Sequence, residues 1–269
     1  MPDRLRLTIL GCSSSPGVPR INGDWGNCDP QNPKNRRRRP SALFERISED
    51  GGVTRVIVDT GPDFREQMLS ANVTSLDAVV YTHPHADHIH GIDDLRSFAL
   101  QTRELVNVHA DRPTMDRLHQ GFGYCFHTPE GSSYPPILRA NLIDHDAPIN
   151  VEGKGGVLTL TPLPQIHGNI ISLGFLAGTM AYCPDISDFP KKTLLMIEKL
   201  DYLVLDALQY RYHPSHLSLD QALDWIAKIS PKKGILTHMH VPLDYDTVMQ
   251  ETPDNVEPAY DGMRLEIEL

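Results

Sequence analysis

The residues with the clearest chemistry stand together in one short stretch, residues 81–91, which reads YTHPHADHIHG. Three histidines and one aspartate follow the spacing His-x-His-x-Asp-His; they are His83, His85, Asp87 and His88. Imidazole nitrogens and carboxylate oxygens are ligands that divalent transition metals prefer. His83 and His85 can direct two rings at one ion, while Asp87 and His88 face a second position. A single ion would leave ligands unused, so the spacing predicts two metals.

An apolar, β-branched run at residues 76–80 precedes this stretch, and an amphipathic segment at 92–100 follows it. This order predicts a buried strand, a turn and then a helix. Such a context distinguishes a metal-binding motif from a solvated histidine-rich loop. We therefore expect the strand and the helix to position the four side chains.

Three further strand ends carry a histidine or an aspartate. His167 and Asp185 each follow an apolar strand, and His238 ends one in the pattern Leu-Thr-His. Each residue alone is a common feature of a polar surface. Their order along the chain, combined with the motif, predicts that they complete one centre. His240 lies two residues beyond His238, and both an auxiliary role and no role stay open for it.

The segment 210–218 holds the expected proton donor. It follows an apolar strand and exposes His213 and His216 just before a predicted helix. That position suits a general acid, and the backbone N–H groups of the helix start suit an anion. We expect His216 and Asp87 to be catalytic, and His213 and His216 to contact the substrate.

Weaker candidates surround the proposed centre. Arg96, on the predicted helix after the motif, and Ser14, in a serine-rich loop, are candidates for substrate phosphate contact. Asp59 ends an apolar strand and is predicted to hydrogen-bond a ligand histidine, with a helix cap as the alternative. The arginine run at 36–39 is interpreted as a solvated charge run, with attraction of an anionic substrate as the alternative.

The elements that position these residues are mostly strands. Strands are predicted at 5–10, 41–47, 53–59, 76–80, 106–110, 138–143, 156–163, 172–177, 179–183, 202–208, 234–238, 257–260 and 263–269. Helices are predicted at 62–70, 92–100, 112–126, 191–200 and 218–229, the last with a capping-box pattern at Ser218 and Gln221. The strands fall into two halves, which predicts an α/β fold of two sheets flanked by helices.

Bulk composition sets the remaining bounds. The chain has 269 residues, 40% of them hydrophobic and 22% charged, which suits one layered domain over residues 1–269. No apolar run approaches the ~20 residues of a membrane helix, and no signal peptide is evident, so we expect a cytoplasmic protein. The four scattered cysteines fit reduced thiols. A net charge of −10 argues against a large nucleic-acid surface.

The motif and the three strand-end residues resemble the metallo-β-lactamase superfamily. The resemblance implies a four-layer αββα sandwich with Asp185 bridging two metals, Zn²⁺ or Mn²⁺. The ligands it implies are those proposed above: His83, His85, Asp87, His88, His167, Asp185 and His238. A bridging carboxylate is typical of the phosphodiesterase-type members and is lacking in the zinc β-lactamases. We therefore expect a bridging hydroxide to cleave a phosphodiester.

Across nearly the whole chain the sequence resembles the phosphoribosyl cyclic phosphate phosphodiesterases of the PhnP type. The matching stretches are 10–19, 36–41, 58–61, 82–91, 216–219 and 236–238. The resemblance implies cleavage of a small ribose- or nucleotide-type phosphodiester, assisted by His216. The sequence departs from that family at the cysteine-rich zinc loop, where Cys28 stands alone, so a third, structural zinc is not expected.

Two other functions stay open. Transfer-RNA 3′-processing endoribonucleases share the motif and Asp185 but carry a long basic arm, whereas residues 127–138 lack Lys and Arg. Non-hydrolytic carrier proteins of pyrroloquinoline quinone biosynthesis resemble residues 17–19 and 59–67. The expected partner is a small phosphodiester such as a ribose cyclic phosphate or a nucleotide. Neither nucleic acid nor a membrane is expected, and a homodimer is compatible with the sequence.

Overall fold

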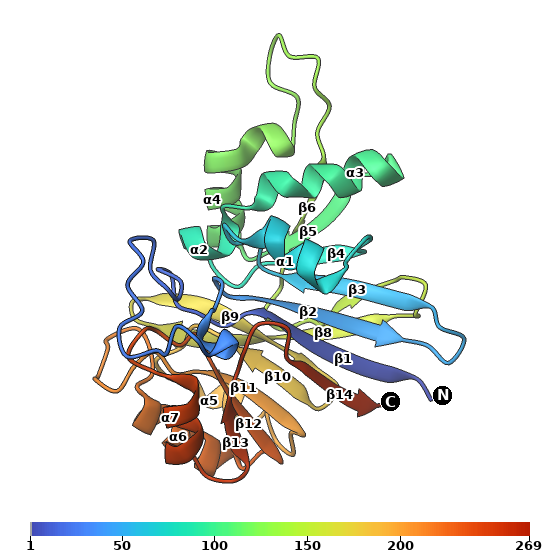
Figure 1. Cartoon of the computed structure of the whole chain (residues 1–269). Helices are drawn as coiled ribbons and strands as arrows, with labels where there is room; N and C mark the ends of the chain where they lie inside the picture. Colours follow the sequence, from blue (N-terminus) through green and yellow to red (C-terminus); the bar gives the residue numbers. More distant parts are fainter. Residues whose placement is uncertain (1) are drawn as a thin grey trace.

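The structure, a computed structural model, describes residues 2–269 and consists of two sheets packed face to face with helices outside each sheet (Figure 1). The strand order is β14-β1-β2-β3-β4-β5-β6 in the first sheet and β13-β12-β11-β10-β9-β8-β7 in the second. This arrangement confirms the predicted αββα sandwich. Among these residues, no helix combines the length and the apolar character that crossing a bilayer requires.

The first sheet joins an antiparallel part, β14 to β3, to a parallel part, β3 to β6. Its strands are β1 (Arg4–Gly11), β2 (Ser41–Ile47), β3 (Val53–Val58), β4 (Ala78–Val80), β5 (Val106–Ala110), β6 (Leu138–Leu142) and β14 (Arg264–Glu268). The helices and 3₁₀ turns on this side are α1 (Phe64–Ala71), α2 (Ala86–Ile89), η2 (Ile92–Leu95), α3 (Arg96–Thr102), α4 (Arg112–Phe122) and η3 (Gly123–Cys125). The 3₁₀ turn η1 (Pro33–Asn35) lies instead beside Asp244 and Tyr245, because Asn35 Nδ2 donates to Asp244 Oδ2 at 2.6 Å and Tyr245 N donates to Asn35 Oδ1.

The second sheet is antiparallel from β7 to β10 and parallel from β10 to β13. Its strands are β7 (Ile149–Val151), β8 (Leu158–His167), β9 (Ile170–Ala177), β10 (Met180–Cys183), β11 (Tyr202–Asp206), β12 (Lys233–Thr237) and β13 (Val256–Pro258). The helices on this side are α5 (Lys191–Leu194), α6 (Leu219–Ile229) and α7 (Tyr245–Glu251). The predicted capping box of Ser218 and Gln221 forms at the start of α6.

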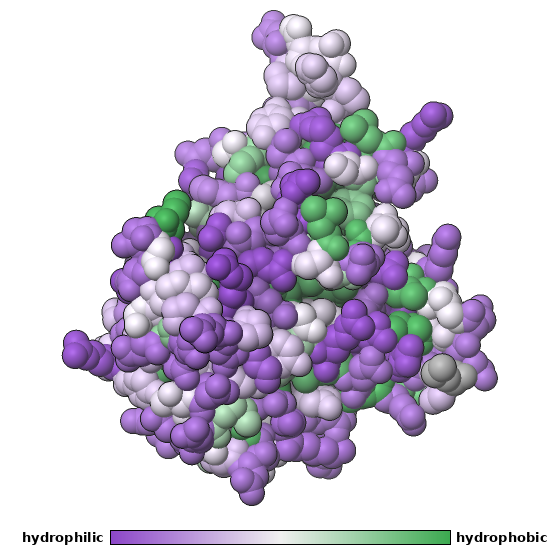
Figure 2. Space-filling view, viewed as in Figure 1, coloured by the Kyte–Doolittle hydropathy of each residue, from purple (hydrophilic) through white to green (hydrophobic). Residues whose placement is uncertain are grey.

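Alternation along each strand divides the core into two layers. Phe44 on β2 and Val56 on β3 pack between the sheets, whereas their neighbours Leu43 and Ile57 pack under the helices. Successive side chains of a strand point to opposite faces, so a strand buried on both faces reads as a continuous apolar run. The outer surface is mainly hydrophilic, with hydrophobic residues in small separate groups on the face that Figure 2 shows.

Several predicted boundaries were wrong. The helix expected at 191–200 ends at Leu194, and Lys199 has a left-handed φ of 56°. The helix expected at 112–126 ends at Phe122, because the chain continues as the 3₁₀ turn η3. Neither β7 nor α7 was predicted; α7 begins after Asp244, whose side chain accepts a hydrogen bond from Thr247 N.

Two glycines allow the loops at one edge of the first sheet to approach each other. A Cβ on Gly61 would lie 2.2 Å from the carbonyl oxygen of Asp87, and one on Gly91 would lie 2.3 Å from the carbonyl oxygen of Gly61. Such distances leave no space for a side chain. The motif segment therefore depends on glycine at both positions.

Gly61→Ala is expected to lower the free energy of unfolding by about 1–3 kcal/mol, because the methyl group forces the backbone of the motif to shift. Urea denaturation measures this change. Gly121 in α4 is the control, since a Cβ there would meet nothing within 4 Å; Gly121→Ala should stabilise the protein by roughly 0.5–1 kcal/mol. Equal effects of the two substitutions would contradict the packing described above.

Candidate metal centre

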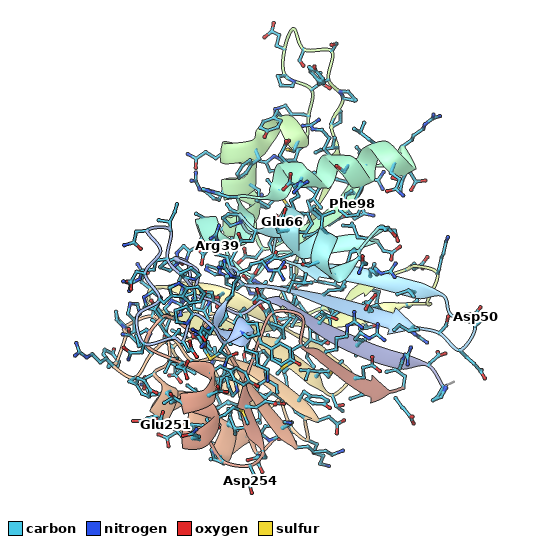
Figure 3. All side chains as sticks on the ribbon, in the orientation of Figure 1. Arg39, Asp50, Glu66, Phe98, Glu251 and Asp254 are labelled. Carbon is cyan, nitrogen blue, oxygen red and sulfur yellow. The ribbon has the colours of Figure 1, made fainter. Side chains whose placement is uncertain are left out.

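All seven predicted ligands lie at one edge of the sandwich, where the two sheets meet. Four of them follow β4, one ends β8, and one each follows β10 and β12. The parallel strands place their carboxyl ends at the same edge, where α/β proteins commonly bind ligands. In the view with all side chains, Arg39 lies at the junction of the N-terminal loop with α1, where its Nε is 3.0 Å from Asp63 Oδ2 (Figure 3).

The first group of ligand atoms consists of three histidines and one carboxylate oxygen. His83 Nε2 lies 2.9 Å from His85 Nδ1, and His167 Nε2 lies 3.4 Å from the same atom. Asp185 Oδ1 is 3.9 Å from His83 Nε2 and 3.9 Å from His167 Nε2. His85 is exposed, whereas His83 and His167 are buried. These four atoms therefore surround one position that opens to solvent.

The second group lies on the other side of Asp185. His88 Nε2 and His238 Nδ1 are each 3.3 Å from Asp185 Oδ2. Asp87 Oδ2 is 3.5 Å from His88 Nε2. The two oxygens of one carboxylate thus face two separate groups of ligand atoms, which is the geometry of a bridging ligand.

Burial tests whether these residues fit metal ions. His88 Nε2, Asp185 Oδ2 and His238 Nδ1 are buried, and among residues 2–269 none of them has a hydrogen-bond partner. Leaving a buried polar atom unpaired costs about 1–3 kcal/mol, so three converging unpaired atoms favour a bound cation at this position. Burial lowers the pKa of His238 to about 3, which keeps the ring neutral. Burial opposes ionisation of Asp185, but His238 and His88 hold its pKa well below the usual range. Imidazole nitrogens that converge with a carboxylate are a set of ligands that fits divalent cations.

Hydrogen bonds outside the centre orient the ligand rings. His88 Nδ1 donates to Asp59 Oδ2 at 2.7 Å, and His167 Nδ1 donates to the carbonyl oxygen of Ser215 at 2.6 Å. Each bond leaves the Nε2 atom of the ring directed at the centre. The predicted contact of Asp59 with a ligand histidine is confirmed. The helix-cap alternative is wrong, because α1 begins after Asp63.

Asp59→Asn is expected to weaken metal binding at the second group by about 10–100-fold, the usual effect of removing a partner of a ligand histidine. Asn is the matched change because Asp59 has a left-handed φ of 63°, which Asn tolerates. A chelator competition titration with zinc measures the affinity. An unchanged affinity in a folded variant would show that the bond to His88 does not support the metal.

His216 lies beside both groups of ligand atoms. Its ring centroid is 4.6 Å from that of His167 and 4.7 Å from that of His238. His216 Nδ1 donates to Asp206 Oδ2 at 2.7 Å. Burial alone would lower the pKa of His216, but the Asp206 carboxylate raises it to about 9. His213 is the adjacent ring, with its centroid 5.2 Å from that of His216.

The sequence analysis missed Asp206, which is fully buried at the end of β11. An aspartate at the end of an apolar strand singled out Asp59, but the strand here was predicted to continue to residue 208, so Asp206 did not stand at its end. Asp206 positions His216 and also accepts a hydrogen bond from Ile186 N at 3.1 Å. It therefore connects the His216 segment to the loop that carries Asp185.

The serine-rich loop reaches the centre through Ser15. Ser15 Oγ donates to Asp87 Oδ2 at 2.5 Å. Ser14, the predicted substrate contact, is buried, and its Oγ is hydrogen-bonded to His240 Nδ1 at 2.8 Å. Arg20 donates to His240 Nε2 at 2.6 Å. The structure thus places His240 beside the loop, with both ring nitrogens occupied.

The predicted arginines have protein partners. Arg96 forms an ion pair with Asp93, its Nη2 2.7 Å from Asp93 Oδ1. Arg37 is 2% exposed and donates to the carbonyl oxygen of Leu243 at 2.6 Å and to Cys28 Sγ at 2.9 Å. The interpretation of residues 36–39 as a solvated run was therefore wrong for Arg37, whereas Arg36 is exposed as that interpretation expected.

The fold and the site together define the class of the protein. The chain matches the Beta-lactamase superfamily domain over residues 54–239, and it belongs to this superfamily. A metal-binding hydrolase fold is therefore established, and the His/Asp clusters are consistent with divalent metals.

Known proteins give more specific likenesses. The crystal structure of a diphosphatase from the PhnP family is 34% identical, covers 99% of this chain and 98% of its own, and has a TM-score of 0.87. An octanoyltransferase of Porphyromonas gingivalis is 34% identical over 264 residues, which are 96% of this chain and 51% of that protein. A ribonuclease Z of Bradyrhizobium diazoefficiens is 25% identical over 151 residues, 54% of this chain and 45% of that protein. The chain spans about half the length of the curated relatives it matches.

Proposed function

We propose that the protein is a dinuclear metal-dependent hydrolase that cleaves a small phosphodiester, of the cyclic ribose or nucleotide type. The observation that supports this most directly is the position of Asp185, whose two carboxylate oxygens face two separate groups of ligand atoms at 3.3–3.9 Å. The metal ligands would be the seven residues predicted from the sequence, with Zn²⁺ or Mn²⁺ as the ions.

The metal ions and the protein residues would have different roles in the reaction. Two divalent ions would supply an activated water and stabilise the charge on the attacked and leaving oxygens. His216 would donate a proton from Nε2 to the leaving oxygen, because its Nδ1 is held by Asp206. Asp87 would orient the second ion through the oxygen that also accepts from Ser15. Buried walls around His88 and His238 exclude bulk water from that side.

The similar proteins differ in how strongly their names support cleavage of a phosphoester by this chain. The PhnP-family diphosphatase, similar over nearly the whole of both chains, acts on a phosphorus–oxygen bond by its name. The octanoyltransferase is named for acyl transfer, but this chain spans only 51% of that protein. Its name is therefore weaker support for acyl chemistry than the diphosphatase name is for phosphorus chemistry. A net charge of −10 disfavours the RNA substrate that a ribonuclease Z binds.

Turnover assays with added zinc or manganese test the proposal. The substrates are bis-p-nitrophenyl phosphate, a 2′,3′-cyclic nucleotide, ribose 1,2-cyclic phosphate, a 3′-extended transfer RNA and p-nitrophenyl octanoate. We expect turnover of the small diesters with the RNA and the octanoyl ester intact. Cleavage of the RNA alone would favour the endoribonuclease, and release of octanoate alone would favour acyl chemistry. No turnover of any substrate, with two metals bound, would favour the carrier function.

A further inference from the structure

Residues 14–17 form a tight turn that touches the second group of ligand atoms. Gly17 N donates to the carbonyl oxygen of Ser14 at 2.9 Å, and Gly17 has a left-handed φ of 77°. Ser14 is buried, whereas Ser15, in the middle of the turn, is exposed. Ser15 Oγ makes the contact with the centre, because it donates to Asp87 Oδ2 at 2.5 Å.

The hydrogen bond from Ser15 orients Asp87. Asp87 Oδ2 lies 3.5 Å from His88 Nε2, so the oxygen that accepts from Ser15 is also the oxygen that faces the second group. A hydrogen bond to a metal-binding carboxylate fixes the direction of that carboxylate. Because Ser15 is exposed, water competes for the same oxygen, and the turn must be held in place for the bond to persist. The turn therefore needs an anchor on its buried side.

His240 provides this anchor. Its Nδ1 lies 2.8 Å from Ser14 Oγ, and its Nε2 lies 2.6 Å from Arg20 Nη2. A guanidinium group has only donors, so Nε2 accepts and the proton of the neutral ring stands on Nδ1, where it donates to Ser14. Within residues 2–269, the Ser14 hydroxyl has no other hydrogen-bond partner. The buried end of the turn is thus fixed by one ring.

Backbone hydrogen bonds fix His240 and the base of the loop independently of the ring. His240 N donates to the carbonyl oxygen of Leu208 at 3.0 Å, and Leu243 N donates to the carbonyl oxygen of His240 at 3.0 Å. Met239 N donates to the carbonyl oxygen of Cys12 at 2.9 Å, which holds the start of the loop. Removing the ring nitrogens of His240 should therefore release the turn without unfolding the surrounding chain.

We propose that His240 is a positioning residue for the second metal position: it holds Ser14 and Arg20, and thereby keeps the turn where Ser15 donates to Asp87. The inference rests on the dinuclear site of the proposed function and adds a residue that acts on that site through the turn. It gives His240 the auxiliary role that the sequence left open. Because Asp87 belongs to the second group alone, the effect is expected at one of the two metal positions.

Zinc titration against a competing chelator tests this role in four single variants. His240→Phe keeps a planar ring without its nitrogens, and it should weaken one of the two zinc equivalents by about 10-fold and leave the other unchanged. Ser15→Ala should give the same loss. His240→Asn can still donate to Ser14, so it should retain more affinity than His240→Phe. His145→Phe is the control, because the His145 ring lies near Asp111 instead; it should bind both equivalents normally.

The double variant Ser15→Ala/His240→Phe distinguishes positioning from a purely structural role. If His240 acts through Ser15, the double variant should bind zinc no more weakly than Ser15→Ala does. Losses that multiply, or normal affinity in folded His240→Phe, overturn the positioning role while the proposed function stands. Where His240→Phe fails to fold by circular dichroism, His240→Asn replaces it in this comparison.

The zinc readout also separates this inference from the proposed function. Fewer than two zinc equivalents in the unaltered protein would overturn the dinuclear site, and the positioning role falls with it. Two equivalents without turnover of any phosphodiester would overturn the proposed activity alone, because the titration of the His240 and Ser15 variants does not depend on turnover.

Discussion

Asp185→Asn is expected to remove metal from both groups of ligand atoms and to lower phosphodiester turnover by about 10³-fold or more. Asp185 supplies one oxygen to each group. An asparagine keeps one oxygen and turns an NH₂ toward the other group, so it cannot bridge two cations. The change also removes the negative charge that faces His88 and His238. Metals contribute several kcal/mol of transition-state stabilisation, and ~4 kcal/mol corresponds to about 10³-fold.

Two measurements check this prediction: metal content by inductively coupled plasma mass spectrometry, and turnover of bis-p-nitrophenyl phosphate. Asp188→Asn is the matched control, because Asp188 is an exposed carboxylate on the same loop that accepts a hydrogen bond from Phe189 N. The control should retain two equivalents of metal. If Asp185→Asn also retained two equivalents and normal turnover, the bridging assignment would be wrong.

His216→Ala is expected to lower turnover by about 10²–10⁴-fold, the contribution typical of a general acid, without a change in metal content. The reason is geometric. His216 lies beside His167 and His238, and its Nδ1 is fixed by the buried Asp206. The substitution removes the proton donor and leaves the seven ligands in place.

The metal content of the His216→Ala variant distinguishes a general acid from a metal ligand. His216 also forms a group with His167 and Asp185 in which the ligand atoms lie within 4.8 Å of one another. A parallel loss of metal and turnover would show that His216 is a ligand rather than an acid. His119→Ala, an exposed histidine on α4, is the control and should change neither quantity.

The convergence of the proposed ligands could be predicted because the fold brings the ends of several strands together. His167, Asp185 and His238 each lie at the carboxyl end of a strand, and parallel strands bring those ends to one edge. Reading apolar strands followed by His or Asp was therefore sufficient. Asp206 was missed because the strand was predicted to continue to residue 208, which placed Asp206 inside it, whereas β11 ends at Asp206.

Contacts between distant segments could not be predicted. Residues 36–39 read as a solvated charge run, yet Arg37 donates to Leu243 and Arg38 Nε lies 2.9 Å from Asp261 Oδ2. More than two hundred positions separate each pair. Periodicity and turn signals describe only residues that are close in the chain, so they do not reveal such contacts. They also do not reveal where tertiary packing ends a helix, and the helix expected at 191–200 was predicted too long.

The proposed ligands come from both halves of the sandwich: four follow β4 of the first sheet, and three belong to the second sheet. Metal bound by these residues would therefore act as a thermodynamic cross-link between the halves. A metal at 100 times its dissociation constant would add about 2.7 kcal/mol to the stability of their association. By reciprocity, a substitution that disturbs the packing between the sheets, such as one at Phe44 in the middle of β2, would weaken metal binding without touching a proposed ligand. The metal content of a purified sample thus reports on the packing of the whole sandwich.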